Sequence, residues 1–360
     1  MSPVLYITTL PPGCKPADVT DVVRDNSTME NEDVNSQVEG PCHLPDLETI
    51  KGAFYILTFI LSVTGNILLL CVLVFYENLK NVTNLFVMNL ICSDLIFTVT
   101  LPFWAVHSLH HWIFGDLACK FMTAAYIIGM YSSVILLTAI TVDRFITVVL
   151  NWPSRPVRRQ RCAIGACVAA WIISIAASIR DATIAKTELL GEIYICEVED
   201  SHSLTTLGYY LQVSLLFFLP FAIIVFCYSA IIKTVLQASN RKKYRTIVVV
   251  LCIVTVFFIC WGPYNVFLFV MVLYEPTCHE FQPFYTAFTV CQIVAYSHCC
   301  MNPLLYMLSQ KTRRHLLQLL RCENPRKESR ERGTGQSTSY NHNVALTAQN
   351  TAIMLDLPTK

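Results

Sequence analysis

The chain has 360 residues, of which 54% are hydrophobic and only 14% are charged, and its formal net charge is +1. A soluble domain usually carries about 25% charged residues, so this composition excludes an ordinary soluble domain and indicates a membrane protein. The nearly neutral total charge argues against nucleic acid as a partner, because nucleic-acid-binding domains are usually strongly basic.

Seven long apolar segments follow one another along the chain. A helix needs about 20 residues to cross a bilayer, and each segment is long enough. The sequence therefore predicts an all-α integral membrane protein, a seven-transmembrane helix bundle embedded in the lipid bilayer. No short apolar segment with a cleavage site precedes the first span, so we expect no cleaved signal peptide. The predicted spans are residues 53–75, 82–106, 117–149, 162–185, 209–236, 246–274 and 284–308.

The basic residues predict the orientation of this bundle, because cytoplasmic loops carry an excess of Lys and Arg. The loops after spans three and five and the segment after span seven are basic, whereas residues 107–116 and 275–283 contain neither Lys nor Arg. We therefore expect the N-terminus outside and the C-terminus in the cytoplasm. The basic residues are Arg155, Arg158, Arg159 and Arg161, then Lys233, Arg241, Lys242, Lys243 and Arg245, then Lys311, Arg313, Arg314 and Arg321.

Four regions are expected along the chain. Residues 1–49 would form an extracellular arm, and its first 48 residues carry two basic and nine acidic residues, a charge of −7. Asn26 begins an Asn-Ser-Thr sequence in this arm and is a predicted glycosylation site. Residues 50–309 would form the bundle and residues 310–322 a short amphipathic helix on the membrane surface. Residues 323–360 are polar and predict a disordered cytoplasmic tail.

Most of the 16 cysteines lie inside the predicted spans, where a free cysteine packs as a small hydrophobic residue. Four others lie at extracellular ends of the spans. The outside of the cell is oxidising, so these four can form disulfides. They are Cys42, Cys119, Cys196 and Cys278.

Ionisable residues inside a membrane are costly, and each one suggests a function. One alternative is that these residues only hold neighbouring helices together, since a polar contact between helices contributes about 1 kcal/mol. That role would explain one or two of the residues but not the motifs around them. The ionisable residues are Asp94, the pair Asp143 and Arg144, Asp181 beside Arg180, and His298. The motif residues are Asn66, Asp94, Asp143-Arg144, Trp171, Pro220, Trp261-Gly-Pro263 and Asn302-Pro303-x-x-Tyr306.

With these motifs in order and in separate spans, the chain resembles the rhodopsin-like (class A) G-protein-coupled receptors over all seven helices. The stretches "TLP", "HWIFGDLACK", "CWGPYN" and "SHCCMNPLLY", the acidic arm and the four outside cysteines are similar to chemokine receptors. The stretch "SIRDATIAK" is most similar to the XC-type (lymphotactin) receptors.

This resemblance implies a multi-pass receptor of the plasma membrane, not an enzyme. It would bind an XC- or CC-type chemokine outside and activate an inhibitory-class heterotrimeric G protein inside, driving calcium signalling and chemotaxis, with arrestin and receptor kinases as further partners. An atypical, scavenging and arrestin-biased chemokine receptor, or a class A receptor for another peptide, stays open as an alternative. Phe145 follows the Asp-Arg pair where the family usually has Tyr, but the acid and the base are kept, which favours G-protein coupling.

The resemblance also implies site residues. No residue is catalytic and no cofactor is expected apart from an allosteric sodium ion, which as a hard cation prefers oxygen ligands. Asp143 is expected to restrain Arg144 at rest, and Pro263 to let the sixth span pivot. Asp181 would bind the ligand or pair with Arg180 or Lys186. The ligand pocket would comprise Trp104, Tyr126, Asp181, Glu197, Glu199, Tyr264 and Gln292; the signalling switch Asp143, Arg144, Tyr228, Trp261, Pro263, Asn302, Pro303 and Tyr306; the sodium site Asn66, Asp94, Ser133 and Asn302; and the disulfides Cys119–Cys196 and Cys42–Cys278.

Overall fold

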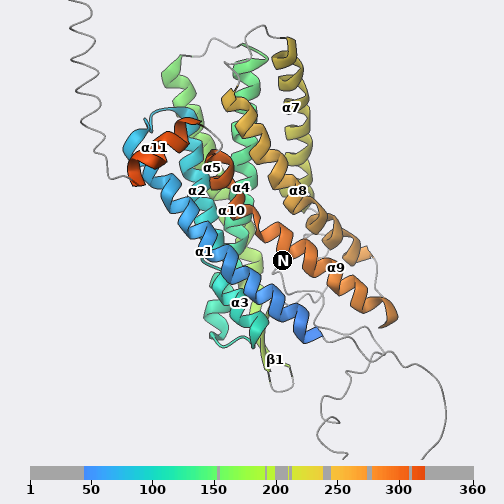
Figure 1. Cartoon of the computed structure of the whole chain (residues 1–360). Coiled ribbons are helices and arrows are strands. Elements are labelled where there is room, and N and C mark those ends of the chain that lie inside the picture. Colours follow the sequence, from blue (N-terminus) through green and yellow to red (C-terminus); the bar gives the residue numbers. More distant parts are fainter. Residues whose placement is uncertain are drawn as a thin grey trace, which may run out of the picture.

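The computed structural model describes residues 44–151, 155–190, 193–198, 210, 213–237, 245–273, 278–307 and 310–320. In this part of the chain long helices lie side by side in an elongated bundle (Figure 1). The elements are α1 (Leu44–Tyr76), α2 (Val82–Thr98), α3 (Leu101–Leu109), α4 (Gly115–Val148), α5 (Pro156–Ile184), β1 (Ala185–Leu190), β2 (Ile193–Val198), the π-helical turn η2 (Ser214–Phe218), α7 (Leu219–Gln237), α8 (Arg245–Leu273), α9 (Cys278–Tyr296), α10 (His298–Met307) and α11 (Gln310–Leu320).

Two ends of the bundle are distinguished below. The outer end carries the hairpin of β1 and β2, and the inner end carries α11 and the arginine-rich start of α5; Figure 1 shows α11 at the end opposite β1. The predicted helical membrane bundle is confirmed, since six helical segments of the described chain are long and apolar enough to cross a membrane. The predicted short helix after the seventh segment is also present, as α11.

The seventh predicted span is 284–308, and its described residues, 284–307, are helical but do not form one continuous helix. It divides into α9 and α10 at a turn at Ser297. The Ser297 backbone N–H still donates to Ile293 at 3.2 Å, and the Cys300 N–H donates to the Ser297 carbonyl three residues back at 3.1 Å. The tighter bond narrows the helix locally. This turn sets the direction of His298, which follows it directly.

The second predicted span is also divided, between α2 and α3. Thr98 and Thr100 both turn their hydroxyls onto the backbone, to the carbonyls of Asp94 at 2.6 Å and of Phe97 at 2.7 Å. Such side chains compete with the regular helical bonds and bend helices. Pro102 lies in the first turn of α3, where its missing N–H costs nothing. The same rule explains why α5 begins at Pro156, ahead of the predicted residue 162.

The structure adds an antiparallel hairpin to the predicted all-α fold. Strands β1 and β2 pair in a register that places Thr187 opposite Cys196 and Lys186 opposite Glu197. This hairpin lies at the outer end of the bundle (Figure 1).

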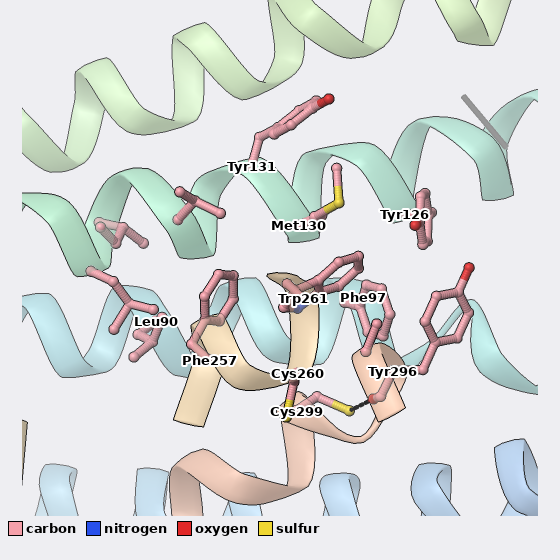
Figure 2. Close-up of a cluster of buried hydrophobic side chains, with 14 of the residues drawn as sticks. Leu90, Phe97, Tyr126, Met130, Tyr131, Phe257, Cys260, Trp261, Tyr296 and Cys299 are labelled. Atoms are coloured by element: carbon pink, nitrogen blue, oxygen red, sulfur yellow. Dashed lines mark hydrogen bonds between the residues drawn. The ribbon is translucent and has the colours of Figure 1, made fainter. Parts of the chain in front are cut away.

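The core of the bundle is aromatic. Figure 2 shows Trp261 of α8 close to Phe97 of α2, with Tyr126 of α4 and Tyr296 of α9 beside them. The ring centroids of Phe97 and Trp261 are 6.0 Å apart, and those of Phe97 and Tyr296 are 5.2 Å apart. Gly129 lets α4 approach α2 here, because a Cβ at this position would lie 2.7 Å from the Phe97 Cβ.

Candidate functional site

Four of the predicted pocket residues are buried in the outer half of the bundle. The Trp261 ring is 6.5 Å from Tyr126 and 5.7 Å from Tyr264, so two of the four meet at the central tryptophan. Trp104 of α3 and Gln292 of α9 are buried as well. These four buried residues therefore come from four helices, namely α3, α4, α8 and α9. Three of them are aromatic, and the fourth, Gln292, carries a polar amide.

The acidic residues predicted for the pocket are placed differently. Asp181 is 3% exposed near the outer end of α5, and its carboxylate lies 3.9 Å from the Arg180 guanidinium. The structure thus shows the ion pair with Arg180, and the binding of the ligand by Asp181 stays a prediction. Glu197 lies on β2 opposite Lys186 and is partly exposed. Glu199 falls outside the described residues, and its role stays a prediction.

Glu48 takes part in a charged cluster that the sequence did not predict. Its carboxylate accepts hydrogen bonds from Lys51 at 2.7 Å and from the Tyr285 hydroxyl, which joins the start of α1 to α9. The Lys51 side chain is only 13% exposed. Glu48 was counted among the acidic residues of the extracellular arm, but in the structure it connects two helices of the bundle, α1 and α9. The only signal in the sequence was the spacing of three residues between Glu48 and Lys51, which is common by chance.

Three buried polar atoms near this cluster have no hydrogen-bond partner within the described residues: Tyr55 Oη, Trp104 Nε1 and His107 Nδ1. The rings of Trp104 and His107 are 6.3 Å apart. A buried polar group without a hydrogen bond costs about 1–3 kcal/mol of free energy. A polar ligand group that forms a hydrogen bond with one of these atoms would therefore recover that cost. Sequence reasoning found Trp104 but missed Tyr55 and His107.

The hairpin is fixed over the outer end by three kinds of bond. The predicted disulfide between Cys119 and Cys196 is present and joins α4 to β2. Asp116 accepts a hydrogen bond from the Thr187 backbone N–H at 3.1 Å. The Trp112 backbone N–H donates to the Tyr194 backbone carbonyl at 2.7 Å. The second predicted disulfide involves Cys42, which lies outside the described residues, so it stays a prediction.

Asp94 is the centre of a polar network in the middle of the bundle, where it is fully buried. Asn302 Nδ2 donates to its Oδ2 at 2.6 Å, and Ser133 Oγ donates to its Oδ1 at 3.3 Å. Nε2 of His298 lies 3.9 Å from the same Oδ1. The structure therefore brings together three of the four residues predicted for sodium.

The fourth, Asn66, is used differently. Its amide nitrogen donates to the Ser62 carbonyl and to the Cys299 carbonyl, each at 3.0 Å, which ties α1 to α10. Its Oδ1 is buried without a partner among the described residues. Carboxylate, hydroxyl and amide oxygens suit a hard cation, so the residues fit sodium in kind. Ser93, which accepts a hydrogen bond from Ser133 at 3.1 Å, supplies a further oxygen that the sequence did not indicate.

His298 links this network to the aromatic core. Its ring lies 5.1 Å from Trp261, 4.9 Å from Phe97 and 5.5 Å from Phe257. Its Nδ1 bonds to the Ala295 carbonyl at 2.9 Å, which directs Nε2 toward Asp94. Trp261 in the aromatic core is therefore separated from Asp94 by a single intervening side chain, that of His298.

At the inner end, Asp143 and Arg144 form no hydrogen bond or ion pair with each other in this structure, so the predicted restraint of Arg144 by Asp143 stays a prediction. Asp143 accepts two hydrogen bonds from Arg159 of α5, from Nε at 2.8 Å and from Nη2 at 2.6 Å. Arg144 instead donates to the Thr83 hydroxyl of α2. Neighbouring residues on a helix point in different directions, so the acid and the base face different helices.

Two of the other predicted switch residues, Tyr228 and Tyr306, lie near Arg144. Tyr228 and Tyr306 are both within electrostatic range of its guanidinium, and Tyr228 Oη accepts a hydrogen bond from Thr141 at 3.3 Å. Pro263 and Pro303 lie inside α8 and α10. Each removes a helical hydrogen bond and permits a bend. Nε of Arg144 is buried without a partner among the described residues.

The family model and the similar proteins that match this chain all point to the same family of receptors. The family described as "7 transmembrane receptor (rhodopsin family)" matches residues 65–306. Chemokine XC receptor 1 of Homo sapiens is 37% identical over 272 residues, which cover 74% of this chain and 80% of that receptor. Chemokine XC receptor 1 of Mus musculus is 36% identical over 267 residues, covering 74% and 81%. C-C chemokine receptor type 1 of Homo sapiens is 32% identical over 296 residues, covering 79% and 81%.

Proposed function

Because the chain belongs to the chemokine receptor family of rhodopsin-like seven-transmembrane receptors, and is thus a receptor and not an enzyme, we propose that it binds an XC- or CC-type chemokine at the cell surface and activates an inhibitory-class heterotrimeric G protein. It is a multi-pass membrane protein, and in this proposal it sits in the plasma membrane with its outer end and N-terminus outside the cell. The basic inner end then faces the cytoplasm, as expected of Lys- and Arg-rich segments.

Capture of the chemokine begins at the acidic arm. Residues 1–48 carry a charge of −7, which attracts basic proteins and raises the rate of encounter. The flexible end of the chemokine then enters the outer pocket beside the anchored hairpin. The unpaired atoms of Tyr55, Trp104 and His107 support this step, because a peptide backbone supplies both donors and acceptors for them.

The geometry that carries the proposal is the short path from Trp261 through His298 to Asp94. The two spacings are 5.1 Å between the Trp261 and His298 rings and 3.9 Å from His298 to the Asp94 carboxylate. Pro263 lies two residues after Trp261, so a displaced tryptophan has a hinge beside it. Transfer of a signal requires a structural element that can adopt two conformations. The ligand and the G protein then shift the equilibrium between these conformations.

Arg144 is the inner end of this path in the proposal. Its release from Thr83, with Tyr228 and Tyr306 moving toward it, would open a surface for the G protein. Calcium signalling and chemotaxis would follow from that coupling. Serine and threonine residues of the tail, residues 323–360, would accept phosphate from receptor kinases and recruit arrestin through the added charge.

A binding screen tests the ligand assignment. Labelled XC and CC chemokines are applied to cells that express the full chain, with cells expressing the Cys119→Ala chain as the control for a disrupted outer end. We expect saturable binding of at least one chemokine to the parent chain and a loss of about tenfold or more with Cys119→Ala. Absence of saturable binding across both chemokine classes would overturn the assignment.

A further inference from the structure

A cavity of about 690 Å³ lies at the inner end of the bundle, far along α4 from Tyr126 of the predicted ligand pocket. Its walls come mainly from α4 and α5, with Ile135 and Ala139 on one side and Ala163 and Ala166 on the other. Pro220 of α7, which is buried, also contributes to the lining. Pockets that hold small ligands typically measure about 300–1,000 Å³, so this cavity has room for a lipid-sized chain.

The cavity opens on the outside of the bundle rather than into its centre. Ile146 is 37% exposed and Leu150 52% exposed, and both belong to its lining. Two polar residues of the lining, Thr138 and Thr147, donate their hydroxyl protons to backbone carbonyls of their own helix at 2.8 and 2.9 Å. The walls are therefore apolar and face the region that lipid tails occupy.

Charge is concentrated at one edge of this cavity. Asp143, Arg158 and Arg159 line it, and Arg159 is already bound to Asp143. Arg158 is exposed and makes no ion pair with any described residue. Arg155 and Arg161 lie close by in the chain, and the first turn of α5 contains no acidic residue. One guanidinium at the mouth is thus free to bind an anion.

We propose that this cavity binds an anionic phospholipid, with its phosphate on Arg158 and an acyl chain between α4 and α5. The inference rests on the orientation given under the proposed function, because the cytoplasmic leaflet holds the anionic lipids and attracts basic segments beside a span. A guanidinium binds phosphate through two parallel hydrogen bonds, which suits Arg158 to this task. The site lies beside the Asp143–Arg159 pair, so in this proposal the lipid composition of the membrane influences the inner end of the bundle.

Native mass spectrometry of the purified full chain tests the site without any chemokine. The chain in detergent is titrated with phosphatidylserine or with phosphatidylcholine of the same acyl chains, and the bound lipid is counted. Arg158→Gln removes the free cation, and Arg161→Gln removes an exposed cation of the same helix that does not line the cavity. Ala166→Leu fills the cavity, and Ala169→Leu adds the same bulk to an exposed position outside its lining.

We expect Arg158→Gln to weaken phosphatidylserine binding about fivefold, while Arg161→Gln changes it less than about twofold. Ala166→Leu should weaken it at least as much as Arg158→Gln, and Ala169→Leu should leave it unchanged. Equal losses with both arginine variants would overturn the proposal in favour of general attraction to a basic surface. Unchanged binding in Ala166→Leu, or equal binding of phosphatidylcholine, would also overturn it. Gel filtration confirms that each variant is folded.

Discussion

Asp143 binds Arg159 through two hydrogen bonds of 2.8 and 2.6 Å, although Arg144 is its neighbour in the chain. The partner lies on the next long helix, α5, and the carboxylate side chain is only 14% exposed. The inner end is therefore held by a contact between α4 and α5 as well as by the hydrogen bond from Arg144 to Thr83 of α2.

Arg159→Gln tests this arrangement. The substitution leaves the Asp143 carboxylate partly buried, with Arg144 as an adjacent cation for it to attract. We expect the G-protein response to chemokine to weaken about fivefold, because Arg144 gains a restraint of about 1 kcal/mol. Dose–response curves measure it, and Arg161→Gln serves as control because that side chain is exposed. A stronger response in Arg159→Gln would contradict the idea that Asp143 restrains Arg144 once it is free.

Gly129→Ala tests the close approach of α4 and α2. A Cβ at Gly129 would lie 2.7 Å from the Phe97 Cβ and 2.8 Å from its backbone nitrogen, so the helices must separate. We expect a loss of about 1–3 kcal/mol, read as a lower temperature of unfolding in detergent. Gly165→Ala is the matched control, because nothing lies within 4 Å of its added Cβ. The control should be neutral or stabilising by up to about 1 kcal/mol, since Ala favours helices.

Cys196→Ala tests the anchoring of the hairpin. The disulfide with Cys119 closes a separation of 77 residues, and its loss removes a covalent link between α4 and β2. We expect destabilisation of about 2–5 kcal/mol and loss of chemokine binding. Thermal unfolding and labelled-chemokine binding measure the two effects. Cys162→Ala, which removes an exposed free cysteine, should change neither. Normal binding by Cys196→Ala would show that the hairpin is dispensable.

Asp94→Asn tests the predicted sodium site. The substitution removes the charge at the centre of the network but keeps its shape, so Asn302 and Ser133 retain a partner. In the parent chain, replacing choline chloride with sodium chloride should weaken chemokine binding at least about fivefold, the lower end of usual coupling between sites. In Asp94→Asn the two salts should give equal affinity. A sodium effect that survives in Asp94→Asn would place the ion elsewhere.

The sequence predicted the bundle well, because a membrane span leaves a long apolar run that composition alone reveals. Its breaks were less visible. The turn at Ser297 and the divided second span depend on local hydrogen bonds, and each lies within a run that is predominantly apolar on both sides of the break. The hairpin of β1 and β2 was missed because it lies outside the spans on which the prediction rested.

The site was predicted in part for a similar reason. Motif residues such as Asp94 and Asn302 were found, and they do meet. Contacts of charged side chains outside these motifs were not found, because one sequence does not reveal which charges approach each other in space. Glu48 with Tyr285, and Asp143 with Arg159, are of this kind.

The central claim is that chemokine binding outside activates an inhibitory-class G protein inside through Arg144. The most direct measurement is nucleotide exchange on that G protein in membranes containing the full chain or Arg144→Ala, with chemokine binding measured on the same membranes. We predict that a bound chemokine stimulates exchange in the parent, and that Arg144→Ala retains binding but loses at least about tenfold of the stimulation. Chemokine binding with arrestin recruitment but no stimulated exchange in the parent would contradict the account.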